Sequence, residues 1–373
     1  GLRDEADDAV NLCDELFQAA LLRAASDIHL IPDERGLAVH LRVDGVLEPY
    51  RELSKSVQPF VINRLKVLAG MDIAEKRSAQ DGRIATYIGN SRQRLEVRVA
   101  SLPTRYGERI TLRVLGNQST DLSLKSLGMS PEDLRKFSSA TERPHGLILL
   151  TGPTGSGKST TLYAAIQQLL SSQGLNVITV EDPIEYEIQG ASQVEVDSAD
   201  KVNFSKALRS ILRHDPDVVM IGEIRDEETA NTAIKAALTG HLVFSTVHTN
   251  TSAGVVTRLI DMAVQPFLVA ATLRLAVAQR LVRKLCPACR QPRPITLEES
   301  LIFGQPQLEG LTSFDAKGCV HCAGKGYSGR IGLFEMLECT SELSKSIAEC
   351  VGEADIAEYA RRHGGRTLLD DGI

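Results

Sequence analysis

The amino-acid sequence predicts an α/β protein in two domains, a mostly parallel doubly wound sheet preceded by a smaller α+β domain. The chain of 373 residues is too long for one simple hydrophobic core. Residues 1–116 contain segments that alternate apolar and polar side chains, as half-buried strands do. From residue 127 onward, short apolar runs are each followed by a helix-like segment, which is the pattern of parallel β-α units.

The N-terminal domain is predicted to begin with a helix and a hairpin. Residues 8–25 place apolar side chains at helical spacing. The stretch GLAVHLRVDGVL alternates and breaks at Asp44-Gly45, a dipeptide that favours a two-residue hairpin turn. A second helix is expected over residues 56–70.

Two arginine-rich strands are expected to close this domain. The segments RQRLEVRVAS and ERITLRVLG put apolar side chains on one face and charged side chains on the other. Residues 72–116 hold eight Arg and one Lys against five acidic residues, a local excess of positive charge in a chain of net charge −6. The polar stretch NQSTDLSLKS, residues 117–126, is predicted to be a linker to the larger domain, residues 127–373.

The composition argues against two classes of protein. The net charge of −6 gives no general attraction to nucleic acid, and the absence of Trp disfavours a translocase that stacks bases in a basic groove. The sequence also lacks an uncharged apolar run of about 18 residues, so a membrane-spanning helix is not expected.

The glycine-rich stretch GPTGSGKST is predicted to bind the phosphates of a nucleoside triphosphate. It has the complete spacing G-x-x-x-x-G-K-S, follows an apolar strand and precedes a helix-like run. Glycines let backbone N–H groups turn toward phosphate oxygens, Lys158 can reach the outer phosphates, and Ser159 can ligate Mg²⁺. The predicted phosphate-binding residues are Gly152, Pro153, Thr154, Gly155, Ser156, Gly157, Lys158, Ser159 and Thr160.

Acidic side chains follow two later apolar strands. NVITVED ends in Glu181 and Asp182, and DVVMIGE ends in Glu223. The carboxyl ends of parallel strands meet at one edge of the sheet, where ligands bind in open α/β folds. A third strand ends in STVHT and places His248 at the same edge. The carboxylates could instead cap the helices that follow them, and His248 could be a structural histidine.

Two Cys-x-x-Cys motifs predict a structural zinc site. The motifs CPAC and CVHC are separated by 29 residues within an insertion over residues 286–330. Four thiolates give closed tetrahedral coordination and leave no position for a substrate. The alternative, a redox dithiol, lacks the pattern of elements that accompanies such pairs. The predicted metal ligands are Cys286, Cys289, Cys319 and Cys322.

Four blocks stand in one order along the chain, namely GPTGSGKST (152–160), ITVEDPIEY (178–186), LRSILRHDPDVVMIGEIRD (208–226) and GHLVFSTVHTN (240–250). In this order and spacing the chain resembles the ATPases of type II secretion and type IV pilus assembly, and the blocks match their Walker A, Asp box, Walker B and His box. The segments ASDIHL, LRVDGVL, QDGRI and ASLPTRYGERITLRVL match the PAS-like N-terminal domain of the same family. The resemblance covers nearly the whole chain and implies a RecA-like P-loop NTPase core.

The resemblance implies a role for each matched residue of this core. Lys158 and Ser159 would hold phosphate and Mg²⁺. Glu223 would be the catalytic Walker B acid, and Glu181 would help to position the attacking water. His248 would be the His-box residue.

The resemblance also implies roles for arginines of the N-terminal domain, which in the family reach toward bound nucleotide. Arg98 and Arg113 are the best matches, with Arg83 and Arg109 as second choices. A guanidinium can neutralise charge on phosphate oxygens in the transition state. Surface ion pairs between neighbouring strands are the alternative interpretation.

Arg209 and Arg213 form a further pair of candidates. They lie four residues apart in a segment predicted to be helical, so they would share one polar face. In the family this helix lines the nucleotide site or the subunit interface. A solvated face is the alternative.

The activity implied by the resemblance is that of a hexameric, ATP-hydrolysing motor with ATP, Mg²⁺ and Zn²⁺ as cofactors. It would be cytoplasmic and peripheral to the inner membrane. It would drive pseudopilus assembly and protein export through a membrane-embedded platform and recruiting proteins. The tetracysteine element is typical of assembly and secretion motors, and the sequence as a whole favours type II secretion, with type IV pilus assembly as the alternative. A small-molecule kinase and a nucleotide-gated scaffold without hydrolysis are further alternatives.

Overall fold

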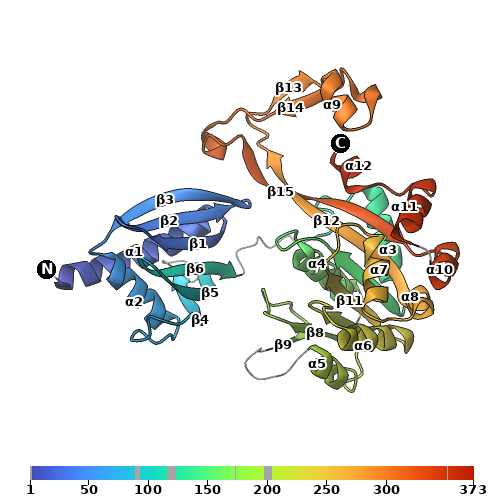
Figure 1. Cartoon of the computed structure of the whole chain (residues 1–373), viewed down its shortest axis with the longest axis horizontal. Helices are drawn as coiled ribbons and strands as arrows, with labels where there is room; N and C mark the ends of the chain where they lie inside the picture. Colours follow the sequence, from blue (N-terminus) through green and yellow to red (C-terminus); the bar gives the residue numbers. More distant parts are fainter. Residues whose placement is uncertain (1, 89–92, 116–122, 173, 197–203, 351) are drawn as a thin grey trace. The chain divides into compact units, whose positions relative to one another are not determined.

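A computed structural model describes residues 2–88, 93–115, 123–172, 174–196, 204–350 and 352–373 (Figure 1). The chain divides into two units, Gly1–Thr120 and Asp121–Ile373. Most of the predicted linker, residues 117–126, lies outside the described residues. In the described part of the chain, every helix is too short or too polar to span a bilayer.

The N-terminal unit is an antiparallel sheet with two helices on one face. Its elements are α1 (Leu2–Leu22), β1 (Ala25–Pro32), β2 (Gly36–Val43), β3 (Val46–Ser54), α2 (Gln58–Leu68), β4 (Gln80–Ile88), β5 (Gln93–Thr104) and β6 (Gly107–Leu115). The strands lie in the order β3-β2-β1-β6-β5-β4, and one apolar core joins the sheet to α1 and α2. The predicted hairpin is confirmed, because Asp44 and Gly45 connect β2 to β3 with φ of +50° and +83°.

The larger unit is built on a seven-stranded sheet, which confirms the predicted mostly parallel architecture. Its strands are β7 (Gly146–Thr151), β8 (Val177–Glu181), β9 (Ala191–Glu195), β10 (Val218–Ile221), β11 (Leu242–Val247), β12 (Leu273–Leu285) and β15 (Tyr327–Glu338). Their order is β15-β12-β7-β11-β10-β8-β9, and β15 alone runs antiparallel to its neighbour in this sheet. Strands β7, β10 and β11 are buried along their whole length, as expected where both faces of a parallel sheet are covered.

Helices cover both faces of this sheet (Figure 1). The helices are α3 (Pro131–Thr141), α4 (Lys158–Ser172), α5 (Phe204–Ile211), α6 (Glu227–Leu238), α7 (Gly254–Asp261), α8 (Pro266–Thr272), α10 (Ser341–Ala348), α11 (Glu353–Arg362) and α12 (Leu368–Gly372). One apolar core contains α3 and α4, and a second core on the opposite face contains α5 to α8 with α10 and α11. This doubly wound arrangement brings the carboxyl ends of the parallel strands to one edge.

A small lobe is inserted between β12 and β15. It contains β13 (Gln291–Pro294), α9 (Leu297–Ile302), β14 (Thr312–Asp315) and two short 3₁₀ turns, Pro306–Leu308 and Val320–Cys322. The antiparallel pair of β12 and β15 carries the lobe at its far end, drawn in orange in Figure 1. We call this segment the cysteine lobe, because it begins at Cys286 and ends just after Cys322.

Candidate functional site

The P-loop connects β7 to α4 at the carboxyl edge of the sheet. Gly152, Gly155 and Gly157 have φ of +148°, +79° and +86°, values that other residues rarely adopt. A Cβ atom on Gly152 would lie 2.4 Å from the backbone oxygen of Gln279, and one on Gly157 would lie 2.9 Å from its Nε2. Strand β12, which carries Gln279, therefore lies so close behind the loop that the first and last glycines have no room for a side chain.

Lys158 begins α4 and is folded against the loop. Its Nζ donates to the carbonyl oxygens of Gly152 at 2.8 Å and Pro153 at 3.0 Å. Burial lowers the pKa of this ammonium, the nearby Glu223 carboxylate raises it, and the Arg280 guanidinium lowers it again. Lys158 thus has an acid and a second cation within electrostatic range.

Glu223 and His248 lie together at the ends of neighbouring strands. Glu223 follows β10 and is half-buried, whereas His248 follows β11 and is exposed. The Oε2 atom of Glu223 lies 3.5 Å from Nε2 of His248, and its Oε1 pairs with the guanidinium of Arg225. Because β7, β11 and β10 are consecutive in the sheet, the structure brings Lys158, Glu223 and His248 to one place.

Glu181 ends β8 and has a different environment. It is 4% exposed, and its carboxylate accepts hydrogen bonds from the hydroxyls of Tyr163 and Thr179, the latter at 2.7 Å, and from Nε2 of Gln193 at 3.0 Å. Burial and the charge of Glu181 raise the pKa of the Tyr163 hydroxyl well above its ordinary range, so this group stays a donor. Both carboxylate oxygens are therefore engaged within the domain, and a role for Glu181 in positioning water stays a prediction.

Arg209 and Arg213 each contact a residue of the same unit. Arg209 lies near the end of α5 and its Nη1 is 2.8 Å from Oε1 of Glu228 on α6. Helix α5 ends at Ile211, so Arg213 lies beyond it, not on the shared helical face that the sequence predicted. The Nη1 atom of Arg213 donates to the carbonyl oxygen of Arg209 at 3.1 Å, which caps the helix. Both side chains are exposed, and their role toward nucleotide stays a prediction.

Three arginines of the N-terminal unit form a row across its sheet. Arg83 on β4, Arg98 on β5 and Arg113 on β6 are cross-strand partners in register. The Nε atom of Arg113 lies 3.1 Å from Oδ1 of Asp27 on β1, which continues the row. Arg109 lies four residues before Arg113 on β6, and pairs with Leu102 of β5. Side chains in register share a face, so the sheet presents several guanidinium groups on the face opposite α1 and α2.

The four cysteines predicted to bind metal meet in the cysteine lobe. Their Sγ atoms all lie within 4.8 Å of one another, with 3.9 Å between Cys286 and Cys319 and 3.8 Å between Cys289 and Cys322. Tetrahedral sulfur coordination with metal–sulfur bonds of about 2.3 Å has edges of about 3.8 Å. Backbone N–H groups of Cys319 and Gly326 each donate to Sγ of Cys322 at 3.1 Å.

These N–H donors also favour the thiolate form that a metal needs. Burial raises the pKa of the Cys322 thiol, but the backbone N–H groups of Cys319 and Gly326, together with the thiols of Cys319 and Cys289, outweigh burial and bring the pKa down to about 6. The geometry and the donors therefore fit a tetrahedral metal ion held by four sulfurs.

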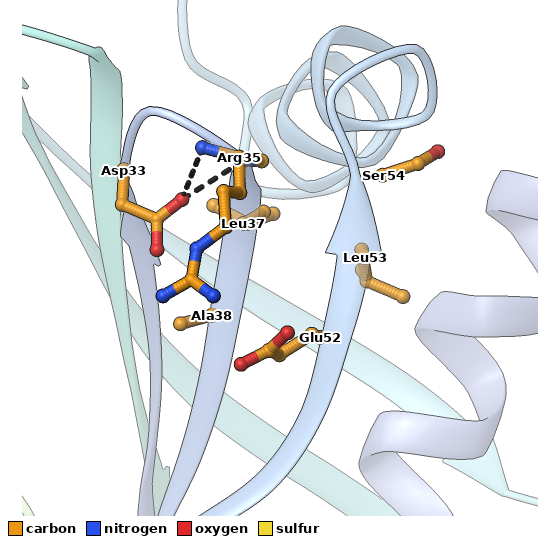
Figure 2. A pocket seen from close by; sticks show the side chains of 8 residues that line it. Asp33, Arg35, Leu37, Ala38, Glu52, Leu53 and Ser54 are labelled. Atoms are coloured by element: carbon orange, nitrogen blue, oxygen red, sulfur yellow. Dashed lines mark hydrogen bonds between the residues drawn. The ribbon is translucent and has the colours of Figure 1, made fainter.

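A hollow of about 150 Å³ lies beside the turn between β1 and β2 of the N-terminal unit, next to the end of β3 (Figure 2). It is lined by Asp33, Arg35, Gly36, Leu37, Ala38, Glu52, Leu53 and Ser54. The Asp33 carboxylate accepts from the backbone N–H groups of Arg35 at 2.7 Å and Gly36 at 2.9 Å, and these bonds lower its pKa. The Asp33 hydrogen bonds stabilise the turn between β1 and β2, and the predicted site residues do not line the hollow. The candidate site is therefore the P-loop edge of the larger unit.

Sequence reasoning missed several residues at this edge. Gln279 and Arg280 reach it from β12, Arg225 pairs with Glu223, and Tyr163 donates a hydrogen bond to Glu181. A polar Gln-Arg pair inside the otherwise apolar run LAVAQRLV was a signal that could have identified the first two.

Comparison with known proteins places this geometry in a family. The family model described as "Type II/IV secretion system protein" matches residues 3–373. The chain is 46% identical over 374 residues to the type II secretion system ATPase E of Vibrio cholerae, covering 100% of this chain and 74% of that protein. It is 43% identical over 373 residues to the type II secretion system protein E of Pseudomonas aeruginosa, again covering 100% and 74%.

Solved structures have the same fold. The Legionella pneumophila ATPase DotB is similar with a TM-score of 0.70 and 24% identity, covering 96% of this chain and 90% of that chain. The pilus retraction motor PilT, solved with bound ADP, has a TM-score of 0.64 and 26% identity, covering 96% and 95%. With the matches over the full chain, these likenesses confirm the predicted RecA-like architecture and the resemblance seen in the motif blocks. The chain belongs to the type II/IV secretion system protein family.

Proposed function

We propose that this chain hydrolyses ATP and thereby drives a type II secretion machine. The observation that carries the proposal is the meeting of Lys158, Glu223 and His248 beside the P-loop in a chain that matches type II secretion ATPases along its whole length. Lys158 would bind the outer phosphates, with the N-terminus of α4 adding its partial positive charge. The Ser159 hydroxyl would hold Mg²⁺, which supplies charge neutralisation on the phosphates when it is bound.

Glu223 is the residue best placed to act on the attacking water. Hydrolysis of the terminal phosphoryl group depends on a positioned water and on cations that neutralise the phosphate oxygens. Glu223 lies close enough to Lys158 to raise the pKa of its ammonium, and the imidazole of His248 lies beside the same carboxylate. His248 would then respond to the presence or loss of the terminal phosphate and pass this change to the loop that follows β11. Glu181 would contribute to water positioning from the end of β8.

The arginine row of the N-terminal unit would complete the site. Arg98 and Arg113 would bring positive charge to the phosphates from the same chain or from a neighbour in a hexameric ring. Differential contact with ATP and ADP would shift the domains between states. The ring would work at the inner membrane as a peripheral assembly, with platform and recruiting proteins as partners. The names of the relatives and the resemblance in the motif blocks support this part.

The cysteine lobe would hold Zn²⁺ through Cys286, Cys289, Cys319 and Cys322. All four ligands are protein thiolates, so the ion would stabilise the lobe and would not act on substrate. The proximity of the four Sγ atoms and the two N–H donors to Cys322 support this assignment.

The test is phosphate release by purified chain with Mg²⁺ and ATP. We expect wild type to release phosphate and Glu223→Gln to bind ATP while losing at least about 100-fold in turnover. Mixing Lys158→Ala chains with Arg98→Ala or Arg113→Ala chains is expected to restore activity if the site is shared between subunits. A wild-type oligomer that binds ATP but never hydrolyses it would favour the nucleotide-gated scaffold and would overturn the proposal.

A further inference from the structure

Strand β12 delivers two polar residues to the P-loop edge, and the first of them is locked in place. Gln279 is 2% exposed, and its Oε1 lies 2.8 Å from the hydroxyl of Thr161 on α4. Its backbone oxygen and Nε2 are the atoms that leave no room for a Cβ on Gly152 and Gly157. The backbone of the next residue, Arg280, is therefore held against the phosphate-binding loop.

In the Arg280 guanidinium, Nη2 makes a hydrogen bond and Nη1 makes none with the described residues. Its Nη2 donates to Oδ1 of Asn250 at 3.4 Å, and Asn250 lies on the His-box loop between β11 and α7. Its Nη1 is buried, and no described residue accepts a hydrogen bond from it. A buried cationic N–H group without an acceptor is strongly unfavourable. An anionic hydrogen-bond acceptor next to Nη1 would remove this cost.

The charges around Arg280 indicate what kind of anion fits. Lys158 is the second cation of this edge, and repulsion from Arg280 contributes to its lowered pKa. The acid facing them, Glu223, already pairs with Arg225 and lies beside His248. Lys158 and Arg280 therefore face a carboxylate, Glu223, that already has Arg225 as its cationic partner. Phosphate oxygens bound in the P-loop would relieve the repulsion and accept from the unused Nη1.

We propose that Arg280 is a phosphate-binding residue of the nucleotide site, that its Nη1 donates to the outer phosphate oxygens of a nucleoside triphosphate, and that Asn250 is its positioning residue. The inference rests on the proposed function and adds a cation to it. Because Arg280 belongs to the same unit as the P-loop, it would act in cis, unlike a guanidinium supplied by a neighbouring chain. It would also link the state of the phosphates to the His-box loop through Asn250.

The experiment uses the full chain and four variants. Arg280→Gln removes the charge, Arg280→Lys keeps it without the planar fork, and Asn250→Ala removes the positioning contact. Arg283→Gln is the matched control, because Arg283 lies on the same strand but is exposed and stacks on the ring of Tyr327 at 4.0 Å. For each variant we would measure equilibrium affinity for a fluorescent non-hydrolysable ATP analogue and for the matching ADP analogue, together with kcat and KM. Far-UV circular dichroism and the melting temperature report folding.

We expect Arg280→Gln to weaken binding of the ATP analogue about 10- to 100-fold, as for loss of a charge-assisted hydrogen bond, with a smaller effect on the ADP analogue. Arg280→Lys should recover part of this affinity. Asn250→Ala should bind the ATP analogue about 3- to 10-fold more weakly, since it removes only the contact that positions Arg280. Arg283→Gln should stay within about twofold of the wild-type affinity.

A folded Arg280→Gln variant with wild-type affinity and wild-type KM would overturn the inference. If wild type binds the ATP analogue but releases no phosphate, the proposed function fails, and the binding measurements still decide the role of Arg280.

Discussion

Removal of one hydroxyl, in Tyr163→Phe, tests the interpretation of the buried Glu181 cluster. Tyr163 is 1% exposed, and its hydroxyl donates to one carboxylate oxygen of Glu181. The same hydroxyl accepts from the backbone N–H of Glu185 at 3.3 Å. The ring packs edge-on against Tyr186 with 4.4 Å between centroids, and a phenylalanine ring would keep that contact. The variant therefore removes a hydrogen bond to a buried charge and leaves the packing intact.

The expected loss follows from the partners that remain. Thr179 and Gln193 both donate to Oε2 of Glu181, so Oε1 loses the donor that Tyr163 supplies. A hydrogen bond to a charged group contributes about 1.5–3 kcal/mol to stability. The N–H of Glu185 is only half-buried, so water can replace its acceptor at little further loss. We expect the larger unit to lose about 2 kcal/mol of unfolding free energy.

Tyr186→Phe is the matched control, since its hydroxyl is buried and has no hydrogen-bond partner among the described residues. Its removal should be neutral or slightly stabilising. Denaturant unfolding followed by far-UV circular dichroism measures both variants. The transition of the larger unit should be the one that added Mg²⁺ and ADP shift to higher denaturant. Equal midpoints for wild type and Tyr163→Phe, or an equal loss in the two phenylalanine variants, would refute the reasoning.

Three further predictions concern the metal site and the P-loop. Cys319→Ser removes one of four sulfur ligands, so we expect purified protein to lose bound zinc and heat stability, measured by atomic absorption and by melting; one zinc per chain in this variant would contradict four-sulfur coordination. Gly157→Ala puts a Cβ 2.9 Å from Gln279 Nε2 at a φ of +86°, and equilibrium binding should show ATP affinity lowered by about tenfold or more; wild-type affinity would show that the loop adapts. Burial lowers the pKa of Lys158 below its ordinary 10.5. The side chain therefore carries its positive charge at pH values below the lowered pKa and loses the charge as the pH rises through it. ATP affinity should therefore fall at a lower alkaline pH than for an exposed lysine. Lys158→Arg, which stays charged, should remove the decline, and an unchanged decline in this variant would assign it to another group.

Local patterns in the sequence were enough to predict much of this protein. The P-loop spacing, the Asp44-Gly45 turn and the apolar runs of the buried strands each depend on residues within one short segment. Backbone preference and side-chain periodicity act over the same short range, so these features can be identified without a partner. The two Cys-x-x-Cys motifs are also local, and the fold had only to bring the two together.

Only the tertiary structure determined which distant side chains meet. Thr161 and Gln279 are 118 residues apart in the chain, and their contact places Arg280 beside the P-loop. The hydrogen bonds to both carboxylate oxygens of Glu181 likewise depend on Tyr163 and Gln193, which come from a helix and an edge strand. Strand partners and buried hydrogen bonds are chosen by the packing of the whole sheet, and a one-dimensional pattern does not encode that choice. The sequence therefore determined the P-loop motif and the family, whereas the assembly of the sheet decided which residues of β12 lie beside that loop.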